Sequence, residues 1–84
     1  MREIFKKIHL KYFAILREER GRAEETTETA AQNLLELYLE LKDRYQFSLP
    51  AEVLKVALND EFQEWDMPLM DEDTVAFIPP VAGG

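Results

Sequence analysis

The sequence predicts an α+β domain in which a mixed sheet packs against one main helix. One long stretch has the helical period, because its apolar side chains recur every three or four residues. Stretches on both sides alternate apolar and polar residues, which is the period of a half-buried strand. Since the helix has one apolar stripe and the strands have one apolar face, packing the two layers together buries both. The predicted element order is ββαβββ or close to it.

The N-terminal part is predicted to hold one strand, a short helix and a polar strand. In the strand over residues 8–14, the positions expected to face the main helix are Ile8, Leu10, Tyr12 and Ala14. Residues 14–20 are expected to form one or two helical turns, which Gly21 ends. Residues 24–28 include two threonines and no apolar pattern, so we expect a polar edge strand there.

The main helix is expected to begin near Ala30. Thr29 followed by Gln32 resembles a capping box, in which two side chains bond to the first free backbone N–H groups. The apolar stripe of this helix consists of Leu34, Leu37, Tyr38, Leu41 and Tyr45. Leu35 and Leu39 lie off the stripe, so they either widen the buried face or are partly exposed.

The part that follows the helix is predicted to return to strands. Residues 48–50 break the helical pattern, and residues 53–58 then alternate as a second strand. Its apolar side consists of Leu54, Val56 and Leu58. Asn59 and Asp60 predict a turn, and residues 61–65 are expected to form the return strand.

A short buried strand is predicted over residues 75–78, near the end of the sequence. Pro79 and Pro80 remove two backbone donors, so the strand stops there and the chain continues in extended conformation. We therefore expect a folded domain over residues 1–79 and a tail over residues 80–84.

The tail ends in a diglycine. The chain has three glycines, and two of them are Gly83 and Gly84. Two glycines leave a bare backbone that fits a narrow slot in another protein. The Gly84 carboxylate is ionised at neutral pH and is a poor acyl donor until it is activated. The tail is therefore either a carrier of an activated carboxyl group or an ordinary frayed end.

Composition limits the chain to one small domain and argues against several functions. Its 84 residues contain no cysteine, which excludes disulfides, thiolate catalysis and cysteine metal sites. Seventeen acidic residues against ten basic ones give a net charge of −7, which opposes binding to nucleic acid or anionic membrane. No apolar run approaches the roughly 20 residues that span a bilayer, and residues 1–7 lack a signal-peptide pattern. We therefore expect a cytoplasmic protein with no membrane or nucleic-acid partner.

Titratable side chains give no sign of a metal site. His9 is the only histidine and has no cysteine or second histidine as a partner, so we expect a solvated strand residue. Asp71, Glu72 and Asp73 form an acidic run, but an EF-hand loop needs a glycine and a spaced glutamate that this run lacks. We expect an acidic turn there.

Three segments resemble the small, sulfur-carrying subunit of molybdopterin synthase, a family within the ubiquitin-like β-grasp sulfur carriers. They are residues 12–18, 56–59 and 73–84. The Pro-Pro-Val-Ala-Gly-Gly ending is the specific part, because a diglycine alone also ends ubiquitin-like modifiers and thiamine-pathway carriers. The chain departs from the pattern at Glu72, where the family usually has glycine, and residues 1–7 extend the usual start. The resemblance implies a β-grasp fold.

The resemblance also implies a carrier mechanism. A ubiquitin-activator-like adenylyltransferase uses ATP to join the Gly84 carboxylate to AMP, and a sulfur donor protein converts it to a thiocarboxylate. The tail segment of Pro80, Val81, Ala82 and Gly83 then threads into the molybdopterin synthase large subunit. Sulfur is transferred there to cyclic pyranopterin monophosphate, in molybdenum cofactor biosynthesis. The chain itself is expected to bind no cofactor and to be no enzyme on its own.

Two other functions stay open for the same tail. One is a sulfur carrier for thiamine synthesis or tRNA thiolation, and the other is a ubiquitin-like protein modifier or a plain interaction module. The Pro-Pro-Val-Ala context disfavours the thiamine and tRNA carriers.

Strand parity predicts where a partner docks. If the buried positions of the first strand face the helix, Phe13 points to the opposite face, and Ile78 of the last strand points out beside it. Phe62 on a neighbouring strand is expected to join them. Large apolar side chains on an open sheet face mark a partner site, unless a loop covers them.

Overall fold

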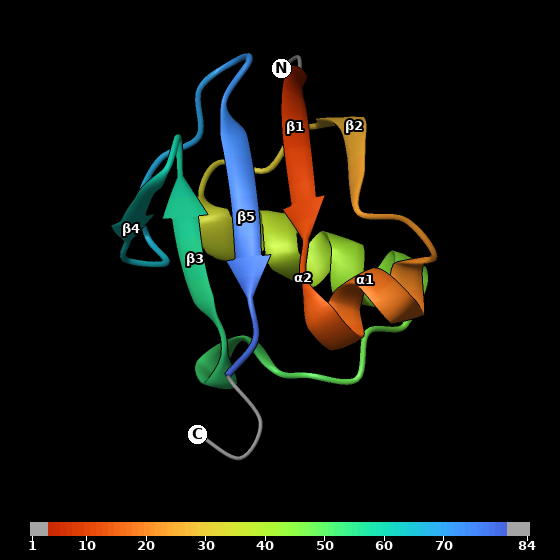
Figure 1. Ribbon diagram of the computed structural model, residues 1–84. Coiled ribbons are helices and arrows are strands. Elements are labelled where there is room, and N and C mark those ends of the chain that lie inside the picture. Colours follow the sequence, from red (N-terminus) through yellow and green to blue (C-terminus); the bar gives the residue numbers. More distant parts are fainter. Residues whose placement is uncertain (1–3, 81–84) are drawn as a thin grey trace.

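The computed structural model describes residues 4–80, which form a five-stranded sheet with one long helix across one face (Figure 1). In chain order the elements are β1 (Lys6–Tyr12), α1 (Ala14–Arg20), β2 (Glu24–Thr29), α2 (Leu34–Tyr45), the 3₁₀ turn η1 (Ala51–Val53), β3 (Lys55–Leu58), β4 (Glu61–Gln63) and β5 (Thr74–Ile78). The strand order is β2-β1-β5-β3-β4, in which β1 and β5 are parallel and the other neighbours antiparallel. The predicted α+β class is confirmed.

The core lies between α2 and the inner face of the sheet. The strands contribute Ile8, Leu10, Tyr12, Val56, Val75 and Phe77, and α2 contributes Leu34, Leu37, Tyr38 and Leu41. These are positions that the strand and helix periods predict. Burial of each large apolar side chain contributes about 1.5–3 kcal/mol, so this contact holds the two layers together. Leu35 and Leu39 are 38% and 49% exposed, and they do not widen the buried face.

The alternation of β1 ends at Tyr12, and the prediction that Ala14 faces the main helix is wrong. Ala14 is exposed, has a φ of 53° and begins α1. This left-handed conformation turns the chain out of the strand direction, so strand parity no longer applies. Gly21 ends α1 as predicted, with a φ of 84° and its N–H donating to Arg17 O at 2.9 Å.

The start of α2 differs from the predicted capping box at Thr29 and Gln32. The N-cap is Asn33, whose Oδ1 accepts a hydrogen bond from Glu36 N at 2.9 Å. Glu36 Oε1 in turn accepts one from Gln32 N at 2.9 Å. Thr29 Oγ1 accepts from Ala31 N at 3.0 Å, which stabilises a turn before the helix. A capping pattern with the predicted spacing exists four residues later than expected, but Glu36 bonds to the N–H of Gln32, one residue before the N-cap, rather than to that of the N-cap itself.

Two predicted strands are shorter than expected. Residues 51–53 form η1, so the strand predicted over 53–58 begins at Lys55 as β3. The return strand predicted over 61–65 ends at Gln63 as β4. Trp65 leaves the sheet and stacks on Phe77, with ring centroids 6.2 Å apart. Packing on the core therefore determines where β4 ends.

The turn between β3 and β4 is the one predicted at Asn59 and Asp60. Both residues have positive φ, 51° and 72°, which is the conformation of a tight two-residue hairpin turn. Asn59 Oδ1 accepts a hydrogen bond from Thr74 N at 2.9 Å, and Asn59 Nδ2 donates to Asp73 Oδ1 at 3.0 Å. The side chain of Asn59 therefore ties this turn to the start of β5.

Tyr38 links α2 to the loop that follows it. Its ring is fully buried, and its hydroxyl donates a hydrogen bond to Leu49 O at 2.6 Å. Burial, with a smaller contribution from the negative charge of Glu19, raises the pKa of Tyr38 to about 12. The neutral hydroxyl is therefore the form that stabilises the fold.

Replacing Gly21 with alanine is expected to lower the free energy of unfolding by about 1 kcal/mol. No atom lies within 4 Å of the added Cβ, so the loss comes from the positive φ alone. Urea unfolding of Gly21→Ala, with the exposed helix residue Glu18→Ala as control, measures it. A Gly21→Ala protein as stable as the control contradicts the assignment of this turn.

Stability is expected to fall at high pH, in part through Tyr38. The folded pKa lies above the ordinary value of about 10, so the contribution of Tyr38 is complete below about pH 10 and is lost as pH rises through about 12. Tyr38→Phe removes this alkaline loss and lowers stability at neutral pH by about 1 kcal/mol, because Leu49 O loses its donor. Urea unfolding from about pH 8 to about pH 12 measures both effects. Equal alkaline slopes in the two proteins contradict this role.

Candidate partner-binding site at the end of β5

The chain leaves the sheet from its centre. β5 is paired on both sides, with β1 and with β3, and is followed by Pro79, which is buried, and Pro80, which is exposed (Figure 1). The predicted tail residues Val81, Ala82, Gly83 and Gly84 lie outside the described residues. Because β5 is held by two neighbours, the position of Pro80 is fixed by the whole sheet.

An apolar hollow of about 690 Å³ lies beside this exit. It is lined by Phe13, Ala14, Ile15, Leu49, Ile78, Pro79 and Pro80. Phe13 and Ile15 are 42% and 40% exposed, and Ile78 is half-buried. The lining therefore offers apolar surface to a partner at the point where the tail begins.

Sheet register explains why Phe13 and Ile78 meet. Tyr12 lies opposite Phe77 in the parallel pair of β1 and β5, so the next residue of each chain lies on the opposite, open face. No loop covers them among the described residues, since both line the open hollow. The geometry predicted for this pair is confirmed, while its role in binding stays a prediction.

Phe62 lies on the same open face but in a different hollow. It is 66% exposed and stands opposite Ala57, whose other neighbour is Ala76 of β5. The hollow beside it has a volume of about 490 Å³ and is lined by Leu54, Lys55, Val56, Phe62, Gln63, Glu64 and Trp65. The structure therefore does not join Phe62 to the cluster of Phe13 and Ile78.

Sequence reasoning assigned only Phe13, Ile78 and Pro80 of the lining to a site, and Ile15 and Leu49 are among the residues it missed. Ile15 comes from α1 and Leu49 from the loop after α2, so only the tertiary structure brings them together. The position of Ile15 next to Leu16 is the feature that could have indicated its exposure. Adjacent residues of a helix point in different directions, so when Leu16 faces the core, Ile15 does not.

Polar contacts hold α1 in place behind Ile15. Arg20 donates two hydrogen bonds to the Glu25 carboxylate, at 2.8 and 3.0 Å, and Tyr12 OH donates a third at 2.6 Å. The Arg20 guanidinium also lies 4.0 Å from the centre of the Tyr45 ring. Burial raises the pKa of Glu25, but the hydrogen bonds from Arg20 and Tyr12 outweigh it, so the pKa ends below its ordinary value. The Glu25 carboxylate is therefore charged, and both of its oxygens accept hydrogen bonds from side chains of the fold.

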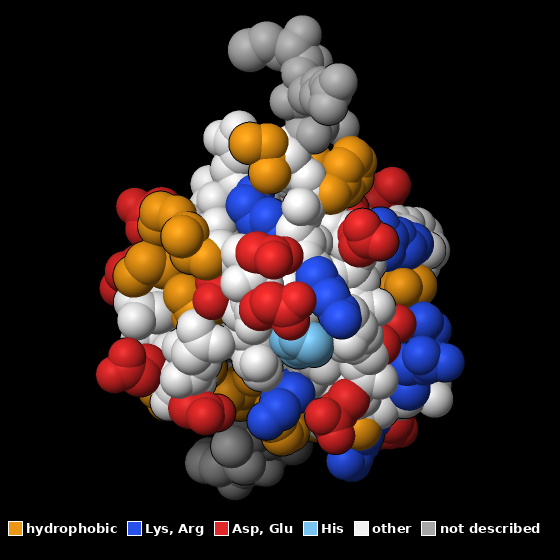
Figure 2. All heavy atoms as spheres, turned by 90° about the horizontal axis from the view of Figure 1, so that it is seen from above, with side chains coloured by type: hydrophobic (Ala, Val, Ile, Leu, Met, Phe, Trp, Pro, Cys, Tyr) orange, Lys and Arg blue, Asp and Glu red, His pale blue; other side chains and the backbone are white. Residues whose placement is uncertain are grey.

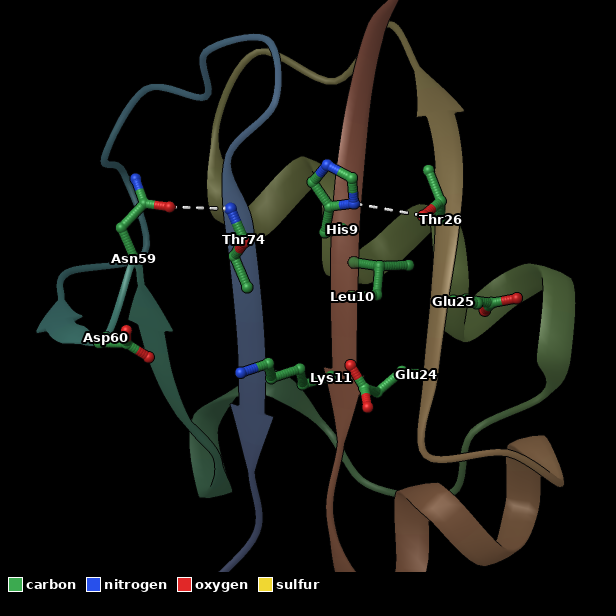
Figure 3. A pocket seen from close by; sticks show the side chains of 9 residues that line it. All are labelled: His9, Leu10, Lys11, Glu24, Glu25, Thr26, Asn59, Asp60 and Thr74. Carbon is green, nitrogen blue, oxygen red and sulfur yellow. Dashed lines mark hydrogen bonds between the residues drawn. The ribbon is translucent and has the colours of Figure 1, made fainter.

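In the view of Figure 2, acidic and basic side chains cover the middle of the surface, and hydrophobic side chains form separate groups around them. A third hollow, shown in Figure 3, is lined by His9, Leu10, Lys11, Glu24, Glu25, Thr26, Asn59, Asp60 and Thr74. His9 is held between Thr26 Oγ1 at 3.3 Å and Glu72 Oε1 at 2.9 Å. Within residues 4–80 no group of three or more His, Cys, Asp or Glu side chains is placed to hold a metal ion.

The acidic run over residues 71–73 is a turn, as expected. Asp71 Oδ1 accepts a hydrogen bond from Lys7 N at 2.7 Å, and Asp73 Oδ2 accepts one from Met70 N at 2.8 Å. Glu72 has a φ of 69°, the conformation that favours glycine, so glutamate here adopts the backbone shape that a glycine usually supplies.

Neither α1 nor α2, the α-helices of the described chain, is long and apolar enough to cross a membrane.

Comparison with known proteins agrees with the topology of the sheet. Residues 10–84 match the ThiS family. The molybdopterin synthase sulfur carrier subunit of Escherichia coli K12 is 45% identical over 42 residues, and this match spans about half of each protein, 50% of the chain and 52% of the relative.

Two solved structures show the same fold. One is a putative molybdopterin converting factor, subunit 1, from Pyrococcus furiosus, with 31% identity and a TM-score of 0.75 over 90% of this chain and 99% of that one. The other is the complex of subunits 1 and 2 of molybdopterin-converting factor from Helicobacter pylori, with 28% identity and a TM-score of 0.63 over 93% and 99% of the two chains. The predicted ubiquitin-like β-grasp fold is confirmed. With a family match that covers residues 10–84, the chain belongs to the ThiS family.

Proposed function

We propose that this chain is the sulfur-carrier subunit of a molybdopterin synthase, and that the carboxyl group of Gly84 carries the sulfur. The observation that carries the proposal is the family match through residue 84, together with the E. coli relative that is named a sulfur carrier subunit. The placement of Pro80 at the end of the central strand supports it, because the following residues start from a fixed point beside an apolar surface.

In the proposed reaction the Gly84 carboxylate attacks the α-phosphorus of ATP on a ubiquitin-activator-like adenylyltransferase, and pyrophosphate leaves. A persulfide on a sulfur donor protein then attacks the acyl carbon, and AMP leaves. A reducing thiol cleaves the resulting acyl disulfide, so that a thiocarboxylate remains and the donor leaves in a disulfide with that thiol. The thiocarboxylate delivers its sulfur to cyclic pyranopterin monophosphate, and hydrolysis returns the carboxylate. This chain supplies the acyl group and its position, and the large subunit supplies the catalytic side chains. The chain is thus a non-catalytic subunit.

The proposed docking surface for the large subunit is the apolar hollow beside the tail exit, with Phe13 and Ile78 as its central residues. A partner seated there lies next to Pro80, and an extended chain from Pro80 to Gly84 reaches roughly 15 Å into it. The H. pylori structure, a complex of two subunits, supports a partner of this kind. Phe62, exposed in a separate hollow on the same open face, is the outlying residue of the proposed docking surface.

Deleting Gly84, or adding one residue after it, is expected to abolish sulfur transfer and leave the unfolding midpoint unchanged. The reacting carboxyl group is then absent or displaced, while the last core residue in the described part of the chain is Phe77. Gly83→Ala keeps the carboxylate but adds a Cβ in the slot, and a misplacement of about 1 Å slows transfer on the order of 10²-fold.

The measurement is the intact mass of the protein after incubation with ATP, the activating enzyme and a sulfur donor. Exchange of one carboxyl oxygen for sulfur marks a carrier, and conversion of cyclic pyranopterin monophosphate by the sulfurated protein and the large subunit identifies the pathway. A protein without Gly84 that still supports conversion contradicts the proposal. Sulfuration without conversion points to thiamine or tRNA thiolation, and conjugation to other proteins points to a modifier.

Aspartate at Phe13 or Ile78 is expected to weaken association with the large subunit by about tenfold or more, because a charge then lies in the apolar contact. Phe62→Asp is expected to weaken it less, since Phe62 lies by a separate hollow. Leu39→Asp is the matched control, because Leu39 is 49% exposed on α2, in the layer behind the sheet (Figure 1). Calorimetric titration gives the affinities and urea unfolding the stabilities. Variants that lose stability but bind normally per folded molecule place the docking surface elsewhere.

A further inference from the structure

The apolar hollow has two walls from distant parts of the chain. α1 supplies Ala14 and Ile15, and the loop between α2 and η1 supplies Leu49. The relative position of α1 and this loop is therefore one determinant of the hollow's shape, and the contacts that join α1 to the loop bear on it.

One glutamate makes this connection. Glu19, in the last part of α1, accepts a hydrogen bond from Ser48 N to Oε1 at 3.1 Å and another from Ser48 Oγ to Oε2 at 2.6 Å. Within residues 4–80 these are the hydrogen bonds that join α1 to the loop before η1. Both carboxylate oxygens of Glu19 accept a hydrogen bond from Ser48, so the contact constrains the orientation of Ser48 relative to α1 as well as its distance from α1.

Leu49 is held on its other side by the core. Tyr38 OH donates to Leu49 O at 2.6 Å, so the residue lies between two hydrogen-bonded points, one on α1 and one on α2. Pro50 follows with its φ fixed by its ring. The Leu49 side chain is therefore placed against the hollow by contacts that do not themselves line it.

We propose that Glu19 is a positioning residue for partner binding: through Ser48 it holds Leu49 opposite Ile15, so that the hollow has the shape the partner's apolar side chain needs. The inference rests on the proposed function, in which the large subunit docks at this hollow. Glu19 is not among the residues that line the hollow. The contact is close to the surface, so it adds little to global stability.

The test is the affinity of Glu19→Gln, Ser48→Ala and the double variant for the large subunit, measured by calorimetry on the full chain. Glu18→Gln is the control, since it removes the same charge from the adjacent residue of α1. Each single variant is expected to bind about two- to tenfold more weakly, the range of one net hydrogen bond. The double variant is expected to bind no more weakly than the weaker single variant, because both changes break one contact. Urea midpoints are expected to match that of Glu18→Gln.

The affinity and urea measurements distinguish failure of the positioning role from failure of the proposed function. If the unmodified chain binds the large subunit and Glu19→Gln binds as tightly as Glu18→Gln, the positioning role is wrong and the proposed function stands. Additive losses in the double variant also overturn it, because the two residues then act separately. If Glu19→Gln lowers the urea midpoint while its affinity per folded molecule is normal, its role is purely structural. An unmodified chain that does not bind the large subunit overturns both proposals.

Discussion

The packing of Phe77 between the two layers is the contact on which the rest of the structure depends. Its ring lies 5.1 Å from that of Tyr38, 6.2 Å from that of Trp65 and 6.5 Å from that of Tyr12, measured between centroids. These partners come from α2, from the segment after β4 and from β1. Phe77, a fully buried side chain of the central strand, thereby holds α2, β1 and the segment after β4 together. The two residues after it, Ile78 and Pro79, enter the apolar hollow from this fixed position.

Local periodicity was enough to predict most of the elements. The alternation and the helical stripe identify β1, α2 and β5, because their burial depends on one repeated contact with the opposite layer. Their predicted ends are less accurate: β1 covers Lys6–Tyr12 rather than residues 8–14, and α2 begins at Leu34 rather than near Ala30. The capping box was misplaced because Thr29 with Gln32 and Asn33 with Glu36 both fit a polar pattern of the same spacing. The structure uses the second pair, and Thr29 forms a turn instead. Strand ends were misjudged where a tertiary contact decides them, as at Trp65.

The sequence predicted the candidate-site residues that directly follow paired strand positions, because only there does the alternation of a strand tell which face a side chain lies on. Phe13 and Ile78 were found because each lies one residue beyond a paired position. Ile15 and Leu49 were not, because a short helix and a loop have no period that says which way a side chain points. Ala14 shows the same limit, since a single positive φ ended the parity of β1. Phe62 was placed on the correct face, but pairing of β4 with β3 rather than β5 puts it in a separate hollow.

The parallel pairing of β1 with β5 has a consequence for how the protein folds. His9 lies opposite Thr74, so nearly the whole chain has to be present before the centre of the sheet closes. Pairing of such distant residues requires the closure of a long loop, and topologies rich in them fold slowly. Phe13 directly follows β1 and Ile78 ends β5, so the surface beside the tail exists only once that closure is complete. A partner that recognises this surface therefore selects finished domains over incomplete or misfolded ones.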